Sequence, residues 1–180
     1  MAEQSRPRKI LGTHDAPYFD ELKELISSQS RDTLLTWVID FVEKTVLPIY
    51  ETRTEARDDR PRAAITDARR ARLYQDFSAR YIKPKVMLAH QAAREAEDDP
   101  ATQAAARTVA FASSCVYELG HTLAVAYYGA AAYAYDKLGV DANPEDLEAL
   151  AKEYVVMYTQ ALAAIAETEV EEPSAIDWRI

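Results

Sequence analysis

A charge-poor, alanine-rich run is the feature that most constrains the fold of this chain. Between Ala101 and Tyr135 only two side chains are formally charged, Arg107 and Glu118. Alanine is the best helix former and the smallest side chain that has a Cβ, so such a run favours helices whose axes approach closely. We therefore expect this run to form the buried centre of the molecule.

The rest of the sequence is helical in character. Only 4 of the 180 residues are glycine, and alternating β-branched residues are almost absent, which argues against a sheet. A chain of this length can bury a full hydrophobic core within one domain. The sequence predicts a single all-α domain over residues 1–180, a compact bundle of about six or seven helices, with residues 1–14 and 168–180 as candidate flexible tails.

Capping signals mark where the helices should begin. A side-chain oxygen at the N-cap accepts a backbone N–H of the first turn, and proline at the first helical position loses no hydrogen bond. Helices are expected to start after these five capping residues: Asp15, Ser30, Asp59, Asp99 and Asn143.

Prolines and glycines indicate where helices bend or end. Pro48 should bend or end the second helix near its last turn, and Gly139 should end the central run. Gly120 leaves two alternatives open, two central helices or one long kinked helix. The third helix is expected to run to about Ala79, and the next one to cover Lys85–Glu97.

Charge is distributed unevenly along the chain. Residues 98–180 hold 14 acids and 4 bases, a net charge of −10, whereas residues 1–97 hold 16 acids and 17 bases, a net charge of +1. The stretch Thr52–Arg94 is basic, with 11 bases and 5 acids. The interleaved acids, and the net charge of −9 on the whole chain, oppose binding to nucleic acid. We expect these bases to form intramolecular ion pairs on solvated helix faces.

The sequence carries no membrane span and no secretory signal that we can identify. Its longest uncharged run, Leu119–Tyr135, has 17 residues, short of the roughly 20 that a membrane helix needs. The basic N-terminal residues are not followed by an apolar segment. We expect a cytoplasmic protein whose single cysteine, Cys115, is a small buried residue.

Glu118 and His121 have a spacing that suggests chemistry. Three residues apart on a helix, they would share a face, and Glu-x-x-His is half of the ligand set of di-iron carboxylate bundles. Neither of the other two histidines follows an acid at that spacing. We therefore expect no metal site, and favour a hydrogen-bonded pair in a tight helix interface. His90, with Arg94 one turn later, is expected to be structural rather than a general base.

Four tyrosines in and just after the centre of the alanine-rich run have two interpretations. They could line a ligand pocket, or they could belong to the core with their hydroxyls reaching its rim. The four are Tyr127, Tyr128, Tyr133 and Tyr135.

Four segments of the chain form a recognisable series. In chain order they are TWVIDFVEKTVLPIYE (36–51), DDRPRAAITDARRAR (58–72), AHQAAREAEDDPATQAAARTVA (89–110) and GAAAYAYDKLG (129–139). Together they resemble the immunity protein five-like family of bacterial toxin and immunity systems, over about residues 36–139. The most specific elements are the tryptophan and the VLP of the first segment and the D-x-RPR-x-AI pattern that begins at Asp58. The alanine-rich part departs from the family pattern, which has a further histidine-containing Ala-His stretch.

The resemblance implies a protein that binds one cognate toxin domain and neutralises it, with no catalytic group and no cofactor of its own. Toxins that act on nucleic acids tend to be basic, so an acidic inhibitor would be steered toward such a partner. On this argument the contact residues are expected among the acids of the last third: Asp141, Glu145, Glu148 and Glu153.

Asp59, Arg60 and Arg62 are a second candidate contact surface. Their structural alternative is an N-cap at Asp59 and arginines that pair with acids elsewhere in the fold.

Two other function classes remain open from the sequence. One is a helical small-molecule or metal-binding protein, or an enzyme, with a tyrosine-lined pocket around Glu118, His121 and His90. The other is a homo-oligomeric scaffold in which the alanine faces pack between subunits. The acidic tail is also open to two interpretations, disorder or docking of Trp178 on the body or on a partner.

Overall fold

The computed structural model describes residues 7–13 and 15–178, and within these ranges it is helical with no strand. The all-α prediction is confirmed. Residues 1–6, 14 and 179–180, which belong to the two expected tails, lie outside the described residues. The helices are α1 (Pro17–Ser27), α2 (Arg31–Thr45), α3 (Leu47–Arg53), α4 (Arg60–Leu73), α5 (Ala79–Glu95), α6 (Pro100–Ser114), α7 (His121–Leu138) and α8 (Pro144–Ala163).

A single residue, Val46, separates α2 from α3. Pro48 lies in the first turn of α3, where its missing N–H and fixed φ are tolerated. The two segments therefore correspond to the one bent helix that Pro48 predicts, and the described residues form seven helical rods when the pair is counted once.

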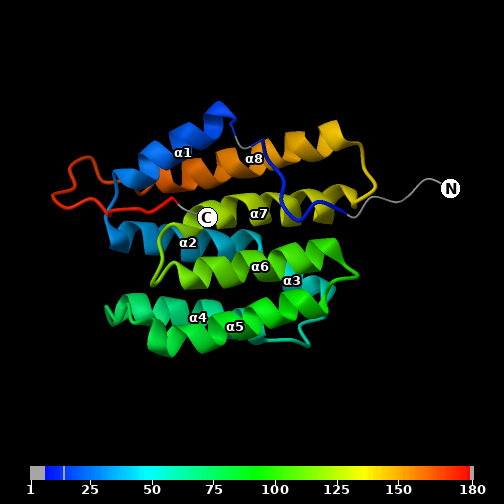
Figure 1. The fold of residues 1–180 in the computed structure, drawn as a ribbon, viewed down its shortest axis with the longest axis horizontal. Coiled ribbons are helices and arrows are strands. Elements are labelled where there is room, and N and C mark those ends of the chain that lie inside the picture. The colour runs from blue at the N-terminus through cyan, green and yellow to red at the C-terminus, as the bar shows by residue number, and fades with distance from the viewer. Residues whose placement is uncertain (1–6, 14, 179–180) are drawn as a thin grey trace.

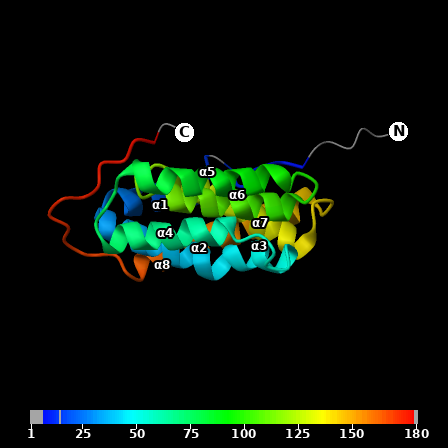
Figure 2. The ribbon, with the colours of Figure 1, turned by 90° about the horizontal axis from the view of Figure 1, so that it is seen from below.

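The rods stack into an elongated bundle. Figure 1 shows α1 and α8 on one side, then α7, α2 and α6, and finally α4 and α5 on the opposite side. Figure 2 views the bundle from the α4 and α5 side, where these two helices lie next to each other. Because α6 packs against helices on both sides of it, α6 and α7 form the centre of the molecule.

The alanine-rich run forms α6 and α7, as expected. Gly120 separates them, which decides between the two alternatives for the centre. A Cβ at Gly120 would lie 2.4 Å from the carbonyl oxygen of Asp177, which belongs to the C-terminal tail. Cys115, in the connector, is fully buried. Nine fully buried alanines allow the close packing: Ala105, Ala106, Ala110, Ala112, Ala126, Ala130, Ala131, Ala132 and Ala134.

Three of the five predicted caps are confirmed. The side chain of Ser30 accepts the Thr33 N–H at 3.3 Å, and Asp99 and Asn143 cap α6 and α8 in the same manner. The prediction for Asp15 is wrong, because α1 begins one residue later, after Ala16. The prediction for Asp59 is also wrong, because its side chain makes no capping hydrogen bond.

The expected boundary between the third and fourth helices is wrong. α4 ends at Leu73, and α5 begins at Ala79 rather than at Lys85. Gln75 has a positive φ of 54° in the turn between them, and Ser78 caps α5 by accepting the Arg80 N–H at 3.3 Å. Pro84 therefore lies inside α5 instead of before it.

The described part of the C-terminal tail crosses the bundle end near α1 and α2. The Ser174 N–H donates to the Gln29 carbonyl at 2.9 Å, and the Glu167 N–H donates to Gln29 Oε1 at 2.8 Å. Ile176 and Trp178 then pack against the core. Among the described helices, none has the length and apolar character needed to cross a bilayer.

Candidate functional site

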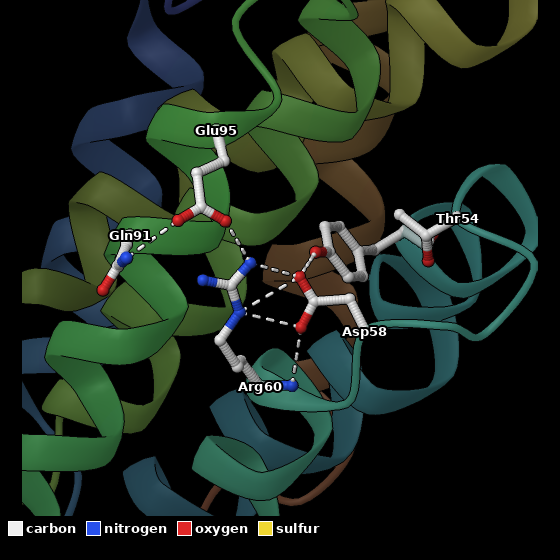
Figure 3. Close-up of polar contacts among 6 residues, drawn as sticks. Thr54, Asp58, Arg60, Gln91 and Glu95 are labelled. Carbon is white, nitrogen blue, oxygen red and sulfur yellow. Dashed lines mark hydrogen bonds and ion pairs between the residues drawn. The ribbon is translucent and has the colours of Figure 1, made fainter.

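Asp58 is the centre of a polar network that joins α3, α4 and α5 (Figure 3). The Tyr50 hydroxyl donates to Asp58 Oδ2 at 2.6 Å. Arg60 donates its backbone N–H to Asp58 Oδ1 at 3.1 Å, and its Nε to the same oxygen at 2.9 Å. The Arg60 guanidinium also donates to Glu95 at 2.5 Å, and Gln91 donates to the other Glu95 oxygen at 2.8 Å. Asp58, not Asp59, is therefore the residue that caps α4.

The charged groups of the network are paired with one another, because Arg60 donates to both Asp58 and Glu95. The hydrogen bonds from Arg60 hold the pKa of Asp58 at about 2, and the Tyr50 hydroxyl adds to this lowering. Burial, and then the Asp58 carboxylate, raise the pKa of Tyr50 well above its ordinary value. Such a set of satisfied, fixed charges stabilises the helix junction and leaves no group ready for proton transfer at neutral pH. The structural alternative for Arg60 is thus the one that the geometry supports.

The remaining bases of α4 that face α2 and α3 are paired with acids of those helices. For the bases of α4 this confirms the expectation of intramolecular ion pairs, and Arg62 is one of them; Arg80 and Lys83 of α5 have no such ion pair in the described structure. The contacts are Arg62 with Glu43 and Glu51, Arg69 with Asp40 and Glu43, and Arg72 with Asp32 and the Thr36 hydroxyl.

Two of the acids expected to contact a partner are instead used inside the molecule. Glu148 forms an ion pair with Arg8 and accepts the Gly12 N–H at 3.1 Å, so it fastens the N-terminal segment to α8. Glu153 accepts the hydroxyl of Tyr133, one turn before Lys137 on α7. The other three acids on the two candidate surfaces, Asp59, Asp141 and Glu145, have exposed side chains.

Glu118 and His121 do not form the buried pair that their spacing predicts. Glu118 is exposed in the connector between α6 and α7, where it accepts the Gly120 N–H at 3.3 Å. His121 Nδ1 instead lies 2.6 Å from the Ser114 hydroxyl. The spacing argument fails because Glu118 is not helical. In the described part of the chain, no three His, Cys, Asp or Glu side chains are grouped so that they could hold a metal.

His90 and His121 both contact the ring of Phe111. The His90 ring meets that of Phe111 edge-on at 5.0 Å, and Phe111 meets His121 edge-on at 5.3 Å. Burial lowers the pKa of His90 to about 4, and the charges of Arg94 and Arg107 add to the lowering. A neutral imidazole packed against an aromatic ring is compatible with the structural role expected for His90, which stays a prediction, while Arg94 is exposed.

The four tyrosines are not gathered around one pocket. Each contacts a different neighbour, so the tyrosine-lined pocket that the sequence left open is not formed by them. Tyr127 stacks on Phe19, Tyr128 stacks on Phe111, Tyr133 lies against Lys137, and Tyr135 donates its hydroxyl to the Arg8 carbonyl at 2.7 Å.

An exposed apolar cluster at the end of α4 and on the outer face of α5 is the feature that the sequence analysis missed. Of the eight large apolar residues that are exposed in the described structure, five lie between residues 73 and 88. We call this group the α4–α5 patch: Leu73, Tyr74, Tyr81, Met87 and Leu88.

A signal for the α4–α5 patch was present in the sequence. In a helix that begins at Ala79, the patch residues Tyr81 and Leu88 lie about two turns apart on one face, and Met87 lies on the strip beside them. Starting the helix at Lys85 cuts this face in two, so its outward apolar residues were not recognised. The opposite face of α5, with Ile82, Val86 and Ala93 among others, is buried.

Comparison with known proteins gives one match. A family model described as "Imm-5 like putative immunity protein" matches residues 24–161. No curated protein and no solved structure matches the chain.

Proposed function

The chain belongs to the Imm-5 like immunity protein family, and from this premise we propose that it binds a cognate bacterial toxin domain and neutralises it. The neutralisation is stoichiometric: the protein covers a surface that the toxin needs, and performs no reaction of its own. The family match spans most of the chain, from α1 into α8. The whole bundle is therefore the unit that presents the binding surface.

The α4–α5 patch is the observation that carries this proposal. Monomeric proteins rarely expose many large apolar side chains together, and such clusters mark surfaces that bind another macromolecule. Elsewhere the polar side chains singled out as candidates mostly serve the fold, as in the Asp58 network and at Glu148. An exposed apolar patch, together with polar side chains that bond within the fold, is more typical of a protein-binding surface than of a reaction centre.

The acids of the last third remain an alternative contact surface. Asp141 and Glu145 are exposed and form no ion pair within the described residues. A basic toxin would be attracted to them. Variants of these two acids therefore belong in any test of the binding face.

The proposal is tested with the toxin domain encoded beside this chain's gene. Co-expression of the active toxin with this protein should restore growth, and the purified proteins should form a 1:1 complex by light scattering. Titration of toxin activity should reach its end point at one equivalent of this protein. The intact mass of the toxin should be unchanged after the complex is dissociated.

Two results would count against the proposal. Inactivation of the toxin by a small fraction of an equivalent would indicate an enzyme acting on the toxin. Stoichiometric iron, manganese or zinc in the purified protein, with a lower melting temperature after chelation, would favour the metal-binding alternative. The control for specific binding is a toxin domain from an unrelated system, which this protein should neither bind nor neutralise.

A further inference from the structure

We infer that the partner docks on the α4–α5 patch, and that it presents an apolar side chain with carboxylates beside it. This inference rests on the proposed function, and adds to it the binding face and the chemistry of the toxin surface. It reverses the sign of charge that the sequence alone suggested for the partner.

The patch has the composition of a binding hot spot. Tyrosine, arginine and methionine are enriched in protein interfaces, and exposed aromatic rings supply much contact area at a small entropic cost. Tyr74 is 78% exposed and Tyr81 is 69% exposed. The Arg80 guanidinium lies 5.8 Å from the centre of the Tyr81 ring, so the two side chains form one amphipathic unit.

The surface of the patch is hollowed at two places near the start of α5. Tyr74, Tyr81 and Ile82 line a hollow of about 490 Å³ between the end of α4 and α5. Lys83, Pro84 and Met87 line a second, shallow depression on the surface of α5. A projecting apolar side chain of the partner can enter the hollow between α4 and α5 and lose contact with water there, and buried anchors of this kind carry most of the binding energy of an interface.

The surface beside Pro84 and Met87 is basic. Arg80 and Lys83 are exposed there, and no acid among the described residues lines that depression. The hollow between α4 and α5 has no net positive charge, because Asp67 lies 3.4 Å from Arg70 and Asp76, which accepts the Ser78 N–H at 3.1 Å, is a second acid. The other arginines of α4 are paired with α2, α3 or α5 and turn their charge inward. The charge offered to a partner beside Arg80 and Lys83 is therefore positive.

The acidic side of the molecule is too far away to cancel this charge. The exposed acids of α1 and α8, such as Asp20, Glu21 and Glu145, lie in the layer at the opposite side of the bundle (Figure 1). Charges separated by much more than about 8 Å of solvent are largely screened at physiological ionic strength. Local charge at Arg80 and Lys83 thus decides which surface fits, and carboxylates complement it.

A second copy of this chain is a poorer occupant than an acidic partner. A symmetric dimer through the α4–α5 patch would place Arg80 and Lys83 of one copy against the same bases of the other. A head-to-tail contact between the basic and acidic layers would not close, and would give open chains of subunits.

The first experiment removes the apolar anchors from the full-length protein. The probe is the neighbour-encoded toxin domain carrying an inactivating active-site substitution. The double variant Y74A/Y81A should raise Kd at least about tenfold, with a melting temperature close to that of the original chain. The matched control L138A/I165A removes two exposed apolar side chains outside the patch and should leave Kd within about twofold.

The second experiment reverses the charge of Arg80 and Lys83. R80E/K83E should slow association about tenfold at low ionic strength, and the difference should shrink as salt is added. K152E, which reverses an exposed base on α8, is the control and should not slow association.

Three outcomes would overturn the inference. If the patch variants bind normally while D141K/E145K loses affinity, the binding face is wrong and the proposed function stands. If the original chain is a dimer that Y74A/Y81A dissolves, the patch is a self-association surface. If the original chain does not bind the toxin domain at all, the proposed function fails as well.

Discussion

The phenol of Tyr154 fills the space above Gly129, so that a Cβ on Gly129 would lie 1.9 Å from the Tyr154 hydroxyl oxygen. Tyr154 is fully buried on α8 and Gly129 is buried on α7. The two helices approach closely at this point because one position has no side chain. This contact connects the alanine-rich centre to the acidic layer formed by α1 and α8.

Gly129→Ala should therefore destabilise the protein, although alanine is the better helix former by about 1 kcal/mol. Overpacking a rigid core costs about 1 to 3 kcal/mol, and the new methyl group would also lie 2.3 Å from Cζ of Tyr154. We expect a net loss of at least about 1 kcal/mol in urea unfolding. In a Tyr154→Leu background the same substitution should cost little, and an equal cost in both backgrounds would contradict this explanation.

Tyr154→Phe should leave stability unchanged or raise it. The Tyr154 hydroxyl is buried, with no hydrogen-bond partner in the described structure, and an unsatisfied buried hydroxyl costs about 1 to 3 kcal/mol. The matched control is Tyr158→Phe, because the Tyr158 hydroxyl donates to the Thr122 carbonyl at 3.3 Å. That control should lose about 1 kcal/mol; if Tyr154→Phe lost more than the control, the Tyr154 hydroxyl would have a partner after all.

Asp58→Asn should lower the free energy of unfolding by about 2 kcal/mol at neutral pH. The Asp58 pKa is about 2 in the folded protein, against 3.8 for an aspartate side chain in water, so its stabilisation is present above about pH 4. It is lost as the pH falls through the folded pKa. The variant should show a smaller fall in stability between pH 4 and pH 2 than the original chain.

Asp59→Asn is the control for that experiment. Its side chain makes no capping hydrogen bond, and exposed substitutions usually change stability by less than about 0.5 kcal/mol. A loss as large as that of Asp58→Asn would mean that the carboxylate at 59, not the one at 58, stabilises the start of α4.

His90→Gln should reduce the sensitivity of the fold to mild acid. Because the pKa of His90 falls from 6.5 to about 4 on folding, the unfolded state takes up a proton first. The original chain should thus lose about 2 to 3 kcal/mol between pH 7 and pH 4 through this group. Unfolding measured at several pH values tests this, and an NMR titration of His90 with a midpoint near 6.5 would contradict it.

Local signals predicted most of the secondary structure. Ser30, Asp99 and Asn143 cap helices because a side chain two or three residues from an amide needs no tertiary contact to reach it. The same reasoning failed at Asp58 and Asp59, where two neighbouring carboxylates are both available. Only the positions of Tyr50 and Arg60 in the folded chain select Asp58.

The candidate site was harder to predict, since it depends on what each side chain meets. The three-residue spacing of Glu118 and His121 predicts a shared helix face only if both residues are helical. Glu118 lies in a connector instead, and the hydrogen-bond partner of His121 is Ser114. The α4–α5 patch was hidden by an error of six residues in the start of α5.

By itself the sequence determined the helical class, the packed alanine-rich centre and the segregation of charge along the chain, because propensity, residue size and charge are local properties. Tertiary structure alone decided which acids form ion pairs within the molecule and which apolar side chains remain exposed. Those outcomes depend on contacts between residues far apart in sequence, such as Arg60 with Glu95 or Arg8 with Glu148.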